Sequence, residues 1–255
     1  MLKARVIPSL LIKSGKLVKT TQFKDAIYIG DPVNAARIFN QKQVPELILL
    51  DINATKDNHP IFIDIVSRVS DECFMPLTSG GGIKTIEDIR QLLNSGAEKV
   101  SINTQAVENP SLIAEASSTF GSQSIVVSID VKKTRQGRYE VYTHDGTKKT
   151  GIDPVALAIK MEEMGAGEIL LNSIDRDGTR QGYDIELVKK VSDSVGIPLI
   201  ASGGAGSIED FSTVIHKGHA SAATAGSLFV FHGKRLAVLI SFPTKEELES
   251  SLSKV

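Results

Sequence analysis

The chain has 255 residues, of which 41% are hydrophobic and 23% charged, and its formal net charge is −1. This length can bury a large core, and the composition is that of an ordinary soluble globular protein. The near-zero charge and the lack of basic runs argue against a nucleic-acid-binding protein. The single cysteine, Cys73, excludes an internal disulfide and fits a reducing compartment. Because neither a signal peptide nor an apolar run of membrane-spanning length stands out, we expect a cytoplasmic protein.

Short apolar runs alternate along the chain with segments of helical spacing. We expect strands at residues 5–12, 46–52, 74–79, 99–103, 124–131, 168–173, 198–202 and 220–225. Several intervening helices have starting caps, as at Asp31-Pro32, Thr85 and Asp153-Pro154. Eight strands alternating with helices predict a closed (β/α)8 barrel, the TIM-barrel fold. The alternative, an open doubly wound sheet, is disfavoured because no G-x-G-x-x-G motif follows the first strand.

An internal repeat favours a barrel made of two half-barrels. Residues 76–89 (PLTSGGGIKTIEDI) reappear at residues 198–211 as PLIASGGAGSIEDF, a shift of 122 positions. Residues 7–13 (IPSLLIK) likewise match residues 126–132 (VVSIDVK), with a shift of 119. A repeat of about half the chain is what two fused half-barrels require. We therefore expect one barrel domain over residues 1–255, with a small hairpin inserted around residues 132–150.

Two glycine-rich turns, each followed by a capped helix, are candidate phosphate sites. Glycine lets backbone N–H groups approach an anion closely, and the positive end of a helix favours negative charge. In barrels, the site after strand seven is usually completed by the turn after strand eight. Tight turns without a ligand are the alternative; two sites across the barrel mouth would suit a substrate with a phosphate at each end. The residues concerned are Gly81, Gly82, Ser202, Gly203, Gly204, Gly226 and Ser227.

Carboxylates and polar residues after other strands are candidates for proton transfer and ligand binding. Asp130 ends the fifth strand, where a carboxylate facing the mouth can act as a general acid or base. Asp177, after the sixth strand, is a second candidate, and a helix cap or a loop salt bridge is the alternative for both. In the repeat, Leu11 stands where the second copy has Asp130. Further ligand contacts are predicted for Asn103, Thr104, Gly178 and Thr179.

Four charged residues precede or begin strands at the opposite, N-terminal ends: Arg5, Glu46, Lys99 and Glu168. In a barrel they would meet near the axis, two of each sign, so they could form a gate. The alternative is that they are solvated strand starts. The five histidines have no metal-ligand spacing, so we expect neither a metal nor a cofactor.

Segments along nearly the whole chain resemble the cyclase subunit of imidazole glycerol phosphate synthase, among them LILLDINA, PLTSGGGI, EKVSINT, SQSIVVSIDVK and GAGEILLNSIDRDGT. The resemblance implies the same barrel, a glutaminase partner on its N-terminal face, and ammonia passing through it to a bis-phosphate ribosyl-imidazole substrate. It also implies that the four charged residues are the gate. Lys19 then helps to hold substrate from a flexible loop after the first strand, and Asp130 is one of two catalytic aspartates.

The other catalytic aspartate of that family falls on Leu11, which cannot move a proton. Ser9, in place of the usual cysteine, is a milder departure. With these two departures and the segment FKDAIYIGDPVNAARIFN, the chain resembles a paralogous branch of the family. Members of that branch accompany a glutaminase and an amidotransferase. There, ammonia converts a sugar acetamido group to an acetamidino group in bacterial surface polysaccharides. We expect an ammonia-conducting subunit of that kind. The alternatives are a genuine cyclase-lyase of histidine biosynthesis that uses Asp177 as its other base, and a non-catalytic activator of a glutaminase.

Overall fold

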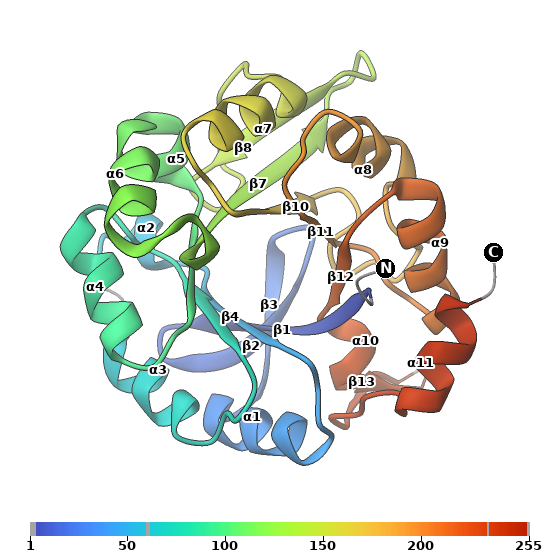
Figure 1. The fold of residues 1–255 in the computed structure, drawn as a ribbon. Coiled ribbons are helices and arrows are strands. Elements are labelled where there is room, and N and C mark those ends of the chain that lie inside the picture. Colours follow the sequence, from blue (N-terminus) through green and yellow to red (C-terminus); the bar gives the residue numbers. More distant parts are fainter. Residues whose placement is uncertain (1–3, 60–61, 234, 254–255) are drawn as a thin grey trace.

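A computed structural model describes residues 4–59, 62–233 and 235–253. Within these residues, eight strands are paired in parallel with their neighbours around a closed barrel, because β12 pairs with β1 as well as with β11. Helices surround the strands on the outside (Figure 1). The predicted (β/α)8 barrel is confirmed. Its strands are β1 (Arg5–Lys13), β4 (Leu47–Asp51), β5 (Leu77–Gly80), β6 (Lys99–Ile102), β7 (Ile125–Lys133), β10 (Glu168–Ser173), β11 (Leu199–Ser202) and β12 (Ala222–Ala225).

The outer helices begin at the caps that the sequence indicates. Asp31 accepts a hydrogen bond from Asn34 N, and Asp153 accepts from Val155 N and Ala156 N, each before a proline that suits the first helical position. The longer helices are α1 (Pro32–Gln41), α3 (Ile63–Ser70), α4 (Ile86–Asn94), α6 (Ser111–Phe120), α7 (Pro154–Glu163), α8 (Ile185–Ser192), α9 (Ile208–Gly218) and α11 (Lys245–Leu252). The short ones are α2 (Ala54–Asp57), α5 (Thr104–Glu108), η1 (Ser122–Ser124) and α10 (Ser227–Val230).

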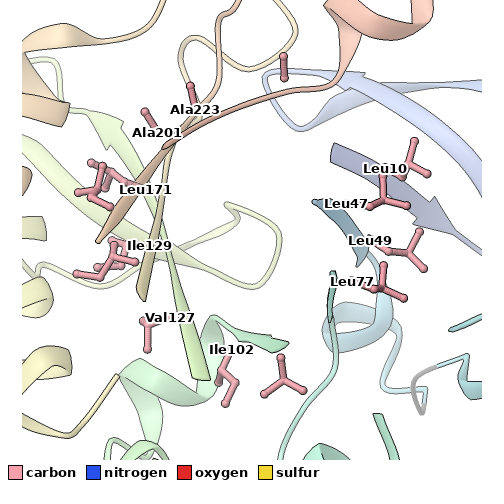
Figure 2. Packing of buried hydrophobic residues seen from close by; sticks show 14 of the residues in the cluster. Leu10, Leu47, Leu49, Leu77, Ile102, Val127, Ile129, Leu171, Ala201 and Ala223 are labelled. Carbon is pink, nitrogen blue, oxygen red and sulfur yellow. The ribbon is translucent and has the colours of Figure 1, made fainter. Parts of the chain in front are cut away.

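The strands are apolar on both faces because both faces are covered. Their outward side chains, such as Leu10, Leu49 and Ile102, form the large core between barrel and helices (Figure 2). A second, smaller cluster fills the barrel interior. We call it the inner apolar layer; its members are Ile7, Ile48, Val126, Leu170, Ile200 and Ala222.

The two halves of the repeat have the same local structure. Helices α4 and α9 each begin with a capping box, formed by Thr85 with Asp88 and by Ser207 with Asp210. Each follows a barrel strand and a glycine turn, β5 in the first half and β11 in the second. The sequence repeat therefore corresponds to a structural repeat.

Antiparallel strands extend the sheet at the mouth, the end of the barrel where the parallel strands have their C-termini. Strands β8 (Tyr139–Thr143) and β9 (Lys148–Lys149) continue from β7, in the segment where a hairpin was predicted. A second hairpin, β2 (Lys16–Thr21) and β3 (Lys24–Gly30), follows β1 where the sequence suggested only a loop. Near the C-terminus β13 (Phe231–His232) pairs with β14 (Ala237–Val238).

Across the part of the chain that the structure describes, no helix combines the length and the apolar character that crossing a membrane requires.

Candidate functional site

The C-terminal ends of all eight barrel strands surround a cavity of about 340 Å³, which we call the mouth cavity. Most of the predicted site residues line it. Among the predicted catalytic and ligand-binding residues the exception is Thr179, whose hydroxyl donates to the Arg176 carbonyl oxygen at 2.8 Å. The predicted residues that line the cavity are Leu11, Lys19, Gly81, Gly82, Asn103, Thr104, Asp130, Asp177, Gly178, Ser202, Gly203, Gly204, Gly226 and Ser227.

Asp130 lies on β7 with two side-chain amides beside its carboxylate. Asn103 Nδ2 donates to Oδ2 at 3.2 Å, and Asn172 Nδ2 donates to Oδ1 at 3.4 Å from the neighbouring strand β10. Burial raises the pKa of Asp130 to about 7; the Asn172 bond opposes this shift, and the charges of Asp145 and Asp177 add to it. Near neutral pH this carboxyl group can therefore both give and take a proton.

Leu11 lines the same cavity from β1, next to Leu50 on β4. Together with Leu170, the two leucines belong to the apolar part of a lining that combines polar and apolar side chains. No side-chain group at position 11 can exchange a proton, so an acid–base partner for Asp130 would have to come from another element.

Lys19 reaches the cavity from the β2–β3 hairpin. Only 4% of the residue is exposed, and its ammonium group donates to the Ser9 carbonyl oxygen. Burial lowers the pKa of Lys19 to about 8, although the nearby Asp177 carboxylate favours the charged form. A Cβ atom at Gly226 would come within 2.1 Å of the Lys19 nitrogen, so this position has room only for glycine while Lys19 occupies its place.

Asp177 holds the hairpin against the loop after β10. Its Oδ2 atom accepts from Thr20 Oγ1 at 3.0 Å and from Phe23 N at 3.3 Å, and its carbonyl oxygen accepts from Gln22 N at 2.9 Å. Burial raises the pKa of Asp177, while these hydrogen bonds and Lys19 oppose the shift. This carboxylate is thus already occupied by contacts within the protein.

Both glycine turns need glycine for conformational reasons. The φ angles are 113° at Gly81, 71° at Gly82, 89° at Gly203 and 112° at Gly204, in the region that other residues rarely adopt. The backbone N–H groups just before each helix are already bound by the capping-box carboxylates: Asp88 accepts from residues 84 and 85, and the equivalent aspartate of α9 accepts from residues 206 and 207. A phosphate in either turn could not use these groups.

The four charged residues at the N-terminal end form a closed ring of ion pairs, which we call the charged ring. Arg5 donates to Glu46 at 2.5 Å and to Glu168, while Lys99 donates to Glu46 at 3.2 Å and to Glu168 at 2.9 Å. Both glutamate side chains are at most 7% exposed. Burial disfavours the Arg5 charge, but the two carboxylates outweigh it and raise the pKa of Arg5. The alternative interpretation, that these four residues are merely solvated strand starts, is therefore wrong.

Sequence reasoning missed several polar residues in and below the cavity. Thr78 Oγ1 donates to Glu46 at 3.0 Å, but a threonine inside a strand has no signal that distinguishes it. Asp51 and Asp145 line the mouth cavity. Asp51 directly ends a strand and could have been found by that position. Asp145 lies in the turn between β8 and β9, and sequence alone did not indicate that this turn reaches the cavity.

Some buried side-chain atoms around the cavity have no hydrogen-bond partner among the described residues. They are Asp51 Oδ2, Ser101 Oγ, Asn172 Oδ1 and Thr224 Oγ1. Buried polar atoms are normally paired, so these atoms suit a polar ligand. In residues 4–59, 62–233 and 235–253, no group of three or more His, Cys, Asp or Glu side chains could hold a metal ion.

Comparison with known proteins places the chain in a family. A model of histidine biosynthesis proteins matches residues 5–236. Imidazole glycerol phosphate synthase subunit HisF of Alkaliphilus metalliredigens is 49% identical over 232 residues, covering 91% of this chain and 92% of that protein.

Two further relatives match almost end to end. A Pseudomonas aeruginosa protein, provisionally named imidazole glycerol phosphate synthase subunit hisF2, is 50% identical over 249 residues, 98% of this chain and 99% of that one. A Leptospira interrogans protein, provisionally named subunit HisF, is 48% identical over 251 residues with the same coverage. The chain therefore belongs to the histidine biosynthesis protein family, among the HisF-like cyclase subunits of imidazole glycerol phosphate synthase.

Proposed function

We propose that this barrel is the ammonia-conducting subunit of a glutamine-dependent amidotransferase system that amidinates a bacterial surface-polysaccharide sugar. A glutaminase partner on the N-terminal face would release the ammonia, and a sugar amidotransferase would work with the mouth. The observation that carries this proposal is the arrangement along the barrel axis: a charged ring, an apolar layer and a polar cavity, in that order.

The inner apolar layer suits ammonia and excludes ammonium. An uncharged molecule crosses an apolar layer at modest cost, whereas an ion loses its hydration there at a cost of several kcal/mol or more. Ile7, Ile48 and Leu170 each stand two residues after a member of the charged ring, and Leu170 also lines the mouth cavity. The ring itself carries no net charge, so it neither attracts nor traps ions of one sign strongly.

Phe74 supports a partner on the N-terminal face. It precedes β5 in the turn after α3, at the same end as the charged ring, and 87% of the residue is exposed. Large exposed aromatic side chains are typical anchors of protein–protein contacts. We expect Phe74→Ala to weaken binding of the glutaminase at least tenfold in a titration followed by calorimetry. Binding that Phe74→Ala leaves unchanged would remove this support.

Leu11 favours the amidination role over histidine synthesis. The resemblance assigns that position to one of two catalytic aspartates, and losing a proton-transfer group typically lowers a rate by about 10²–10⁴-fold. The number 2 in the name of the Pseudomonas aeruginosa relative also fits a paralogous branch. These two observations together support the branch rather than the parent enzyme.

The second candidate is a genuine cyclase-lyase, favoured by the grouping of Asp130, Asn103 and Lys19 in one cavity. The test is to incubate the chain with ammonium chloride and the family's ribosyl-imidazole substrate. We expect little imidazole glycerol phosphate from the wild type and much more from Leu11→Asp, with Leu11→Asn as the uncharged control. Rapid product formation by the wild type would refute our first choice and establish the second.

A further inference from the structure

Asp145 is a cavity carboxylate that neither the resemblance nor the sequence repeat assigns to any role. It lies in the turn between β8 and β9 and lines the mouth cavity. Among the described residues, none donates a hydrogen bond to its carboxylate; its environment is set by burial and by nearby charges. By contrast, the Asp177 carboxylate accepts a hydrogen bond from Thr20 of the β2–β3 hairpin, and one oxygen of Asp51 accepts from Asn53 N. Asp145 is therefore available to a ligand.

The turn that carries Asp145 is firmly held. Three successive residues, His144, Asp145 and Gly146, have positive φ angles of 51°, 55° and 68°. His144 N donates to Thr104 Oγ1 at 3.3 Å, and Thr147 N donates to the carbonyl oxygen of residue 144 at 3.1 Å. A Cβ atom on Gly146 would meet the Phe23 ring at 2.9 Å, so the β2–β3 hairpin packs directly on this turn. Unusual backbone angles that several contacts fix are common where a side chain has a task.

Strand pairing brings this turn close to Asp130. Asp130 on β7 pairs with Tyr142 on β8, and Asp145 follows three residues later. The negative charge of Asp145 is the strongest of the charges that raise the pKa of Asp130. Burial raises the pKa of Asp145 itself to about 6, with Lys56 and Lys13 opposing and Asp57 and Asp51 adding. Near neutral pH, Asp145 is mostly ionised while Asp130 still holds a proton for part of the time.

We propose that Asp145 and Asp130 form an acid–base pair that adds ammonia to the carbon of a C=O or C=N group in a polar ligand bound in the mouth cavity. This role goes beyond the proposed function, because it places a chemical step in this barrel rather than in a partner enzyme. Asp145 supplies the second proton-transfer group that Leu11 cannot.

The step balances without any further reactant. The lone pair of ammonia forms the new N–C bond while the π electrons of the C=O or C=N group move to its oxygen or nitrogen. The Asp145 carboxylate takes a proton from the attacking nitrogen, and the Asp130 carboxyl group gives its proton to the oxygen or nitrogen that received the electrons. The proton on Asp145 then returns to Asp130 through solvent. No electrons are gained or lost overall.

A separate observation indicates that the cavity accommodates a polar ligand. Asp51, Ser101 and Thr224 are all at least nine-tenths buried, line the cavity, and each have a side-chain oxygen without a hydrogen-bond partner in the described part of the chain. The Asp51 oxygen lies 3.9 Å from His59 Nε2, too far for a hydrogen bond. They come from three different strands, β4, β6 and β12. Leaving such atoms unpaired is costly, so a ligand that donates to them would be favoured.

The first test measures whether the two carboxyl groups are coupled. Aspartate carboxyl signals of the whole chain are titrated by NMR in wild type, Asp145→Asn and Asp57→Asn. We expect Asp145→Asn to lower the apparent pKa of Asp130, because a neighbouring negative charge is removed. Asp57→Asn is the matched control, since Asp57 acts on Asp145 but is not among the charges that act on Asp130. An unchanged Asp130 titration in Asp145→Asn would overturn the proposal.

The second test uses the reconstituted amidination reaction with ammonium chloride instead of glutamine as nitrogen source. We expect Asp145→Asn to lower the rate by about 10²-fold or more and to remove the acidic limb of the pH profile. Adding Leu11→Asp to that variant should restore part of the rate, which a merely structural role of Asp145 would not allow. A full rate in Asp145→Asn would overturn the proposal and leave the proposed function intact. If no amidination occurs in wild type, the proposed function fails. The NMR titration alone then decides whether Asp145 and Asp130 form a pair.

Discussion

Replacing Asp130 by asparagine should change the pH dependence of stability in a direction that the burial of this carboxyl group determines. In the folded protein its pKa is raised from 3.8 to about 7, mainly because burial disfavours the charged form. Between these two values the folded state keeps a proton that the unfolded state has released. The free energy of unfolding therefore falls as the pH rises through this window, and the full contribution is present only below the unfolded pKa.

The size of the effect follows from the shift. About three pKa units correspond to roughly 4 kcal/mol, since one unit is about 1.4 kcal/mol. Asn cannot titrate, so Asp130→Asn should gain up to about 4 kcal/mol relative to wild type between about pH 4 and pH 8. The Asn172 bond favours the ionised form of Asp130, and its pH-dependent part in wild type is already contained in this shift.

Urea unfolding at a series of pH values measures this difference. Asp71→Asn, an exposed aspartate at the end of α3, is the control and should show no comparable trend. A difference between Asp130→Asn and wild type that stays constant across the whole range would mean that Asp130 ionises normally. The reasoning about its acid–base role would then be refuted.

Three further changes test other contacts. Arg5→Ala leaves two buried glutamates without their guanidinium partner and should cost about 3–5 kcal/mol of unfolding free energy. Arg37→Ala, which breaks an exposed pair, should cost far less; equal costs would contradict the burial argument. Gly226→Ala should displace the Lys19 ammonium group from its buried place and so raise the Lys19 pKa, which NMR can measure. An unchanged pKa would show that Lys19 does not move. Thr20→Val should loosen the β2–β3 hairpin and speed its cleavage in limited proteolysis, and an unchanged cleavage rate would contradict the proposed contact.

The barrel could be predicted because its signals are local. Apolar runs such as LILL, proline after an N-cap at Asp31 and Asp153, and the repeated SGGG and SGGAG turns each depend on a few neighbouring residues. The closed ring of opposite charges was also foreseeable, since parallel strands bring their first residues to the same end. The contact between Thr78 and Glu46 could not be foreseen, because sequence alone does not show which side chains of neighbouring strands lie side by side.

The features that escaped prediction depend on contacts between distant segments. The β2–β3 hairpin is held by Asp177, more than 150 residues away in the chain. Asp145 faces the cavity because β8 pairs with β7 in one particular register, and a shift of one residue would turn its neighbours to the other face. The sequence indicated the helix caps. Only the hydrogen bonds of the structure show that the capping-box carboxylates compete with a phosphate for the same backbone N–H groups.

The central claim is that ammonia from glutamine reaches the mouth cavity through the charged ring. Lys99→Met tests it most directly, because Arg5 still bonds both glutamates and keeps the ring partly formed. In the reconstituted system with a glutaminase, amidinated product is measured once with glutamine and once with ammonium chloride as nitrogen source. We predict that Lys99→Met lowers the glutamine-dependent rate at least tenfold and leaves the ammonium-dependent rate near that of wild type. Equal effects on both rates, or no effect on either, would contradict the account.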